Sequence, residues 1–283
     1  MTQFSHFWKR LSAFFVCSVV ALSLQTAHAT LVVFPNGSWT AGAPAPGQTV
    51  SQVFPTITPN LTISLNNNGA SAQGMTWAPG YATINSTQTT GGFAGQNGLQ
   101  LYATASSSTT AYILTTITFA SPVTNVSFQL WDVDKAAGQF ADTISAIQAL
   151  SSTGTVQAAS SVTSAVAGFN TITGSGLGIV VNGTAGASNT TNQGTIDISF
   201  AGPITQFSFR WSNSDTGLGA QAIGVGNINF TAVPEPNSLW GLVGLLGIVA
   251  THRAFATSQA RNQRVKPSAA RAPGPHDVIK ATT

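Results

Sequence analysis

The sequence predicts an all-β protein, an antiparallel β-sandwich or jelly roll placed between two terminal targeting segments. Short runs rich in Thr, Ile, Val and Phe recur between turn residues over residues 30–231, which is typical of strands. No eleven-residue window there has helical periodicity. Only 6% of the 283 residues are charged, against roughly 25% in an ordinary soluble domain. The polar surface is therefore supplied by Ser, Thr, Asn, Gln and Gly.

The first 29 residues have the pattern of a secretory signal peptide. Lys9 and Arg10 precede an apolar run over residues 11–24, and alanines at positions 27 and 29 supply the small residues that signal peptidase requires. The run is shorter than the ~20 residues of a membrane span, which favours a cleaved signal over an anchor. We expect cleavage before Thr30 and export of the mature chain.

Residues 30–231 are expected to form one exported sandwich domain. Alternation of apolar and polar residues is clearest in 196–200 and 223–230, so these strands should bury one face and expose the other to water. Residues 36–59, rich in Pro and Gly, are expected to form an irregular lead-in. The expected strands are residues 61–65, 99–103, 111–119, 123–131, 143–150, 169–173, 177–181, 195–200, 204–211 and 221–231.

One segment of the domain has an internal copy. Residues 117–128 align without gaps to residues 198–209, with seven identities in twelve positions. Each copy predicts a strand, a proline-containing turn and a second strand that opens at Pro122 or Pro203, where no ladder N–H is needed. We expect two equivalent hairpins.

The distribution of residue types excludes several functions. All four histidines and the single cysteine lie outside residues 30–231, so a Ser-His-Asp triad, a Cys-His pair and a His or Cys zinc site are impossible within the domain. Lys135 and Arg210 are its two cations, too few to neutralise a phosphate backbone. The chain is therefore expected to be no enzyme, with no nucleic-acid partner and no cofactor other than a Ca²⁺ ion.

That Ca²⁺ hypothesis rests on one carboxylate cluster. Asp132 and Asp134 are two residues apart, so a strand would place them on one face, and Asp142 follows across a loop that contains Gly138. Two or three carboxylates with loop carbonyls suit a hard cation. Two alternatives stay open: the aspartates shape a polar loop, or Asp132 and Asp134 are the acid and base of a hydrolase.

Two tryptophans stand at the ends of expected strands. Trp131 and Trp211 each follow one copy of the internal repeat. They could stack on sugars, or they could cap the core. An exposed, concave strand face that carries Trp77, Trp131 or Trp211 would favour carbohydrate binding.

The C-terminal part carries three features in sequence. Pro234-Glu235-Pro236 is followed by an apolar run over residues 239–250 and by basic residues that begin at Arg253. The prolines stop a preceding strand, the run predicts a short transmembrane helix within residues 232–256, and the basic residues favour a cytoplasmic end. Residues 257–283 have the composition of a basic disordered tail.

This arrangement resembles the sorting signal of PEP-CTERM proteins, over about residues 233–254. The resemblance implies that the chain is an exosortase substrate in a Gram-negative bacterium. It would insert transiently in the inner membrane through the helix and its Arg253 anchor, be cut near Pro234-Glu235-Pro236, and reach the cell surface or extracellular matrix. Family members usually end within a few residues of the basic cluster, whereas about 30 residues follow it here.

Together these patterns predict an exported structural protein of the cell surface or the exopolysaccharide matrix. The alternative is a carbohydrate-binding module, with or without Ca²⁺. A hydrolase that uses Asp132 and Asp134 is less favoured, and so is ice binding, because the sequence has no sustained array of threonines at fixed spacing.

Overall fold

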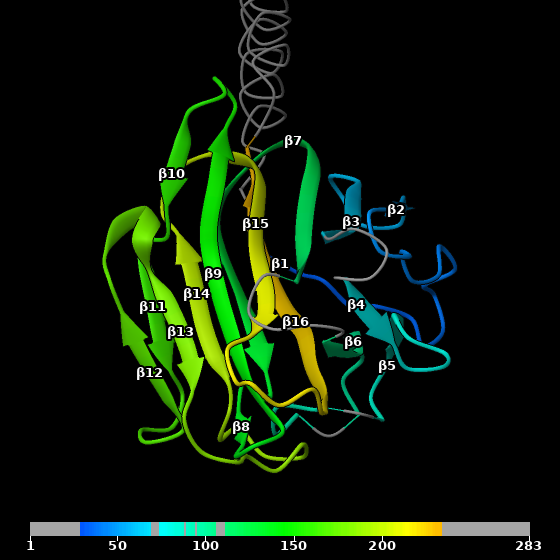
Figure 1. Cartoon of the computed structure of the whole chain (residues 1–283). Coiled ribbons are helices and arrows are strands. Elements are labelled where there is room, and N and C mark those ends of the chain that lie inside the picture. Colours follow the sequence, from blue (N-terminus) through cyan, green and yellow to red (C-terminus); the bar gives the residue numbers. More distant parts are fainter. Residues whose placement is uncertain (1–28, 69–73, 88, 94, 106–110, 234–283) are drawn as a thin grey trace, which may run out of the picture. The chain divides into compact units, whose positions relative to one another are not determined.

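The computed structural model describes residues 29–68, 74–87, 89–93, 95–105 and 111–233. These residues form an all-β fold in which every strand pairing is antiparallel (Figure 1). In this part of the chain the only helix is the 3₁₀ turn η1 (Gly176–Gly178), and no helix is long and apolar enough to cross a membrane. Residues 1–28 of the expected signal peptide lie outside the described residues, and so do Pro234-Glu235-Pro236, the apolar run after it, Arg253 and the basic tail.

Strand β7 (Tyr112–Trp131) organises the fold because its two halves have different partners. Its first half pairs with β3 (Leu61–Asn68) and β15 (Ile204–Asn213), whereas its second half pairs with β14 (Ile196–Phe200) and β16 (Ala220–Ala232). Hydrogen bonds thus link the strands into one continuous network. The change of partners along β7 divides that network into two sheets, which is a known way to build the corner of a sandwich.

Sheet I contains the second half of β7, flanked by β14 on one side and β16 on the other. Its remaining strands are β11 (Ser161–Ser164) beside β14, β6 (Gly98–Ala105) and β1 (Ala29–Leu31) beside β16, and β4 (Met75–Trp77) and β5 (Thr83–Asn85) beside β6.

Sheet II contains the first half of β7, flanked by β3 and β15. Its remaining strands are β2 (Thr49–Phe54) beside β3, β9 (Phe140–Ser151) beside β15, β13 (Val180–Gly183) and β10 (Val156–Ala158) beside β9, β12 (Asn170–Thr173) beside β13, and the two-residue β8 (Lys135–Ala136), which pairs with the start of β9.

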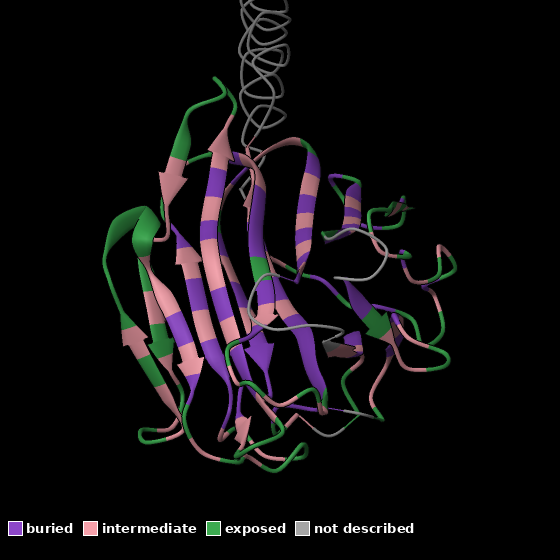
Figure 2. Cartoon of the chain, viewed as in Figure 1, coloured by how far each residue is buried: buried purple, intermediate pink, exposed green. Residues whose placement is uncertain are grey.

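The core lies between the two sheets. Buried and partly exposed residues alternate along β3, β7 and β14, and Figure 2 shows the same banding on β7 and β9. Phe128 of sheet I stacks on Phe207 of sheet II at 4.4 Å between ring centroids, and Phe119 of sheet II meets Phe230 of sheet I edge-on at 5.0 Å. Burial of each such ring stabilises the fold by roughly 1.5–3 kcal/mol.

The structure corrects the expected turn at Pro122. The segments 111–119 and 123–131 are not two strands of a hairpin but one extended strand, β7, that passes through Pro122. Proline has no N–H, so the ladder can be interrupted there. Val123, the next residue, pairs with both Ile204 and Ala232. Pro122 therefore marks the place where β7 leaves one sheet and enters the other.

The internal repeat is also built differently from two hairpins. The second copy separates β14 from β15 at residues 201–203, yet both strands run antiparallel to β7, which contains the first copy. Ile198 pairs with Phe128, and Phe207 pairs with Ile117. The two copies therefore lie side by side and pair with each other, at the junction of the two sheets.

Two further expectations need correction. Residues 177–181 were expected to form a strand, but η1 occupies 176–178 and β13 begins only at Val180. The lead-in over residues 36–59 is not wholly irregular, because β2 lies within it and pairs with β3. The other nine expected strands are confirmed, although 111–119 and 123–131 are joined in β7.

Candidate functional site

The three expected metal ligands follow β7 and open β9. Residues 132–134 are not in a strand, and Asp132 has a positive φ of 64°. Asp132 and Asp134 therefore do not share a strand face, contrary to the sequence expectation. All three carboxyls are nevertheless enclosed: Asp132, Asp134 and Asp142 are 6%, 8% and 0% exposed.

Hydrogen bonds join Asp134 to Asp142. Asp142 accepts the backbone N–H of Asp134 at 3.1 Å through Oδ2 and the indole N–H of Trp211 at 2.7 Å through Oδ1. Asp134 accepts the backbone N–H of Ala187 at 2.8 Å. Oδ1 of Asp132, in contrast, is buried without a hydrogen-bond partner. The structure therefore fixes two of these carboxyls and leaves an oxygen of the third unpaired.

Burial dominates the electrostatics of the cluster. Burial, together with the smaller effect of the neighbouring charge of Asp134, raises the pKa of Asp132 to about 8. Burial likewise raises the pKa of Asp134, whereas the hydrogen bond from the N–H of Ala187 and a side-chain hydrogen bond with Asp142 lower it. It holds the pKa of Asp142 well above its usual range, although the N–H groups of Trp211 and Asp134 act in the opposite direction. Three ionised carboxylates here would need a balancing charge.

The cluster is not a finished coordination shell as its side chains stand. Among the described residues no group of three or more His, Cys, Asp or Glu side chains is arranged to hold a metal ion. The hydrolase interpretation is not supported either, because Asp132 and Asp134 are almost enclosed and neither lines the groove described below. A general acid or base must reach the substrate.

The two tryptophans expected to contact sugar are both buried. Trp131 and Trp211 are 0% exposed, so neither indole offers a face on which a sugar could stack, and that interpretation is wrong for this structure. Trp211 belongs to the core. Trp77 is half-buried against the core, and its N–H donates to the carbonyl of Pro44 at 2.8 Å.

Trp131 occupies a cage made by glycines. A Cβ added to Gly226 would lie 2.1 Å from an indole carbon, and a Cβ added to Gly91 would lie 2.3 Å from one. Gly98 and Gly224 also face the ring. Phe93 lies 6.2 Å from it, centroid to centroid. Trp131 therefore supports the segment around residues 91–98.

A polar groove of about 360 Å³ lies on one face of sheet I. Its walls come from β7, β14, β16 and β1, with Phe93 from the loop before β6. We call this feature the sheet I groove. Its lining residues are Leu31, Phe93, Ser127, Phe128, Gln129, Asp197, Ile198, Ser199, Asn227 and Asn229.

Strand register places the groove's polar side chains opposite one another. Gln129 lies opposite Asp197 and donates to it at 2.8 Å, and Ser127 lies opposite Ser199. On β16 the register shifts at Asn227, which has a positive φ of 49°. The amide of Asn227 donates to Gln129. The floor of the groove is thus a pre-arranged set of amides, hydroxyls and one carboxylate.

Sequence reasoning did not identify the groove. Alternation in residues 196–200 correctly indicated one buried and one wet face. It could not show that the wet faces of β14, β7 and β16 adjoin, because those strands are far apart in the sequence and their order depends on the crossing of β7. The bulge at Asn227 has a weak local signal in the nearby Gly224 and Gly226.

Comparisons with known proteins identify no family for this chain. No family model matches the chain, and no curated protein matches it. The family 11 carbohydrate-binding module of the cellulosomal cellulase Lic26A-Cel5E of Clostridium thermocellum is similar over 74% of this chain and 98% of its own, at 12% identity and a TM-score of 0.29.

Two further solved structures are similar to this chain at equally low identity and TM-score. A family 11 module from Clostridium thermocellum in complex with a β-1,3-1,4-mixed-linked tetrasaccharide covers 75% of this chain and 99% of its own, at 11% identity and a TM-score of 0.29. A structure of carbohydrate-binding modules from the β-sandwich superfamily covers 73% and 86%, at 12% identity and a TM-score of 0.28. With TM-scores this low, these likenesses carry no argument about function.

Proposed function

We propose that this chain is an exported surface or matrix protein whose sandwich binds carbohydrate in the sheet I groove. The observation that carries the proposal is the composition of that groove: cross-strand Gln129 and Asp197, cross-strand Ser127 and Ser199, and apolar contacts from Phe93 and Leu31. Sugars present hydroxyls at their edges and C–H groups on their faces. A site with convergent amides and hydroxyls beside apolar side chains matches both.

The charge of the groove favours a neutral ligand. Asp197 is the one ionisable side chain among its lining residues. A carboxylate accepts hydrogen bonds from sugar hydroxyls, but it repels a uronate or a sulfate ester. The groove should therefore bind neutral polysaccharides and discriminate against anionic ones.

Affinity gel electrophoresis of the full chain in neutral and in anionic polysaccharides tests this proposal. Asp197→Ala and Asn229→Ala should each weaken retardation by a neutral glycan roughly 2- to 10-fold, the effect of one or two lost hydrogen bonds. Thr116→Ala is the matched control, because Thr116 points away from the core on sheet II. Wild-type chain that runs unretarded in every neutral glycan would refute the proposal.

Delivery to that environment is proposed on the sequence. The signal peptide pattern and the PEP-CTERM-like segment flank the sandwich, and its first and last strands are neighbours, with Thr30 paired to Phe230. We infer export, processing by an exosortase-type enzyme near Pro234-Glu235-Pro236, and release or attachment outside the cell.

Mass spectrometry of the extracellular protein from producing cells tests the delivery. The expected species begins at Thr30 and ends near Pro234 to Pro236. Recovery of an extracellular species that retains Arg253 and the basic tail would show that no such processing occurs. Replacement of Glu235 by Ala should lower the processed fraction, and Glu235→Asp is the conservative comparison.

A further inference from the structure

We propose that Asp132, Asp134 and Asp142 form a structural binding site for a hard divalent cation. Ca²⁺ is the cation used below to test the site. The site is separate from the sheet I groove and does not depend on carbohydrate binding. Four features of the described residues support it: burial, missing charge balance, orphaned oxygens and spare acceptor capacity.

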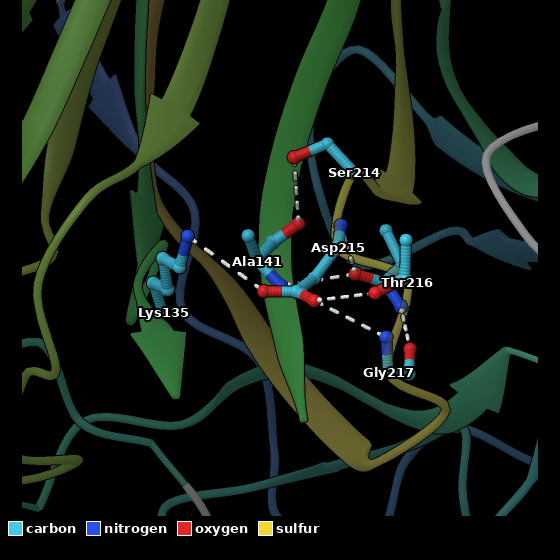
Figure 3. Close-up of polar contacts among 7 residues, drawn as sticks. Lys135, Ala141, Ser214, Asp215, Thr216 and Gly217 are labelled. Carbon is cyan, nitrogen blue, oxygen red and sulfur yellow. Dashed lines mark hydrogen bonds and ion pairs between the residues drawn. The ribbon is translucent and has the colours of Figure 1, made fainter. Parts of the chain in front are cut away.

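No cation among the described residues balances the cluster. Lys135 and Arg210 are the two cationic residues of the described chain. Lys135 pairs with Asp215 at 3.6 Å (Figure 3), and the guanidinium of Arg210 lies 4.4 Å from the ring centroid of Tyr112. Neither is among the groups that act on the three buried carboxyls. Their negative charge must therefore be removed by protons or balanced by a bound cation.

The orphaned oxygens point to a missing ligand. Asp132 is only 6% exposed and its Oδ1 is unpartnered, although buried polar atoms are normally satisfied. Gly194 packs directly against it: a Cβ added there would lie 3.0 Å from the Asp132 Cα. The next residue, Thr195, also has a buried hydroxyl without a partner. Two unsatisfied oxygens thus occur in two adjoining segments.

The other two carboxylates retain acceptor capacity. An ionised carboxylate has about four lone-pair sites, and the bonds to Ala187, Trp211 and the Asp134 N–H use only some of them. These bonds hold Asp134 and Asp142 in place. The side chains do not converge as a complete shell, so metal binding requires rearrangement of the carboxylates. The Oδ1 of Asp132 has no hydrogen bond to lose in that rearrangement.

Thermal unfolding of the full chain, first treated with chelator and then titrated with Ca²⁺, tests the site. Ca²⁺ at a hundredfold excess over Kd should raise Tm by about 5–10 °C. Asp132→Asn and Asp134→Asn should abolish that rise. Asp197→Asn, which alters the sheet I groove instead, should keep it. Identical melting curves with Ca²⁺ and with chelator would overturn the proposal, as would a rise that survives in both cluster variants.

A direct measurement covers the case in which a variant fails to fold. Equilibrium dialysis of the wild-type chain against Ca²⁺, with metal analysis, should find about one tightly bound ion per chain, and no bound ion refutes the site. Failure of carbohydrate binding would leave this result unchanged, because the two readouts concern different residues.

Discussion

At the scale of single residues, the link between Trp211 and Asp142 connects the core to the carboxylate cluster. Trp211→Phe keeps an aromatic ring but removes the donor to Asp142 Oδ1. Because Asp142 is fully buried, no water replaces the lost bond. We expect a loss of about 1.5–3 kcal/mol in the free energy of unfolding, measured by urea denaturation.

Trp39→Phe is the matched control for that variant. The Trp39 N–H donates to the carbonyl of Gly42, a residue exposed to water. Water can satisfy that carbonyl after the substitution, so the loss should be smaller, about 0.5–1.5 kcal/mol. Equal losses in the two variants would mean that the hydrogen bond to Asp142 contributes no more to stability than the one to Gly42.

The glycine cage around Trp131 gives a second prediction. In Gly226→Ala the new methyl group would lie 2.1 Å from an indole carbon, so the ring or β16 must move. Overpacking of this kind costs typically about 1–3 kcal/mol. Gly178→Ala is the control, because a Cβ there meets nothing within 4 Å. Comparable Tm values for the two variants would contradict the tight packing.

Sequence reasoning found the residues of the cluster but not their environment. The spacing of Asp132, Asp134 and Asp142 marked them as a group, yet a strand was expected where an irregular segment with positive φ exists. Their burial depends on residues 183–195, which are distant in the sequence: Gly183 and Gly194 pack against Asp134 and Asp132. Nothing local to the aspartates specifies those contacts.

At the scale of secondary-structure elements, alternation predicted the long strands well. Burial along β3 and β14 has a clear period of two, and β9, β15 and β16 were also expected from the sequence. Short strands such as β4, β8 and β10 are two or three residues long and carry no periodic signal. The crossing of β7 at Pro122 was missed, because proline is equally compatible with a turn and with an interruption of the ladder.

Packing between the two sheets leads to a prediction about β15. Phe207 contacts the rings of Phe119, Phe128 and Phe200, at centroid distances from 4.4 to 6.1 Å. Phe207→Ala should therefore destabilise the sandwich by about 3–5 kcal/mol, measured by urea denaturation.

Phe93→Ala is the companion variant, because Phe93 is only half-buried, belongs to the loop before β6 and lines the sheet I groove. It should leave most of the stability intact and weaken glycan retardation. A Phe93→Ala chain that loses as much stability as Phe207→Ala would place Phe93 in the core instead.

At the scale of the whole molecule, the scarcity of charge controls how the sandwich meets its surroundings. Two cations and five aspartates occur in residues 30–231, and three of those aspartates are buried away from solvent. The outer surface is therefore almost free of fixed charge. Such a surface presents hydroxyls and amides to its surroundings and has little long-range attraction for polyanions.

Salt dependence is the measurement that follows from this charge distribution. Contacts made by amides, hydroxyls and apolar side chains are barely screened by ions, so retardation by a neutral glycan should change less than about twofold between roughly 0.05 and 0.5 M NaCl. Binding through several cations to a polyanion would instead fall by orders of magnitude over a smaller range. A steep loss of glycan retardation with added salt would therefore locate binding outside the sheet I groove, in the basic residues that follow Arg253.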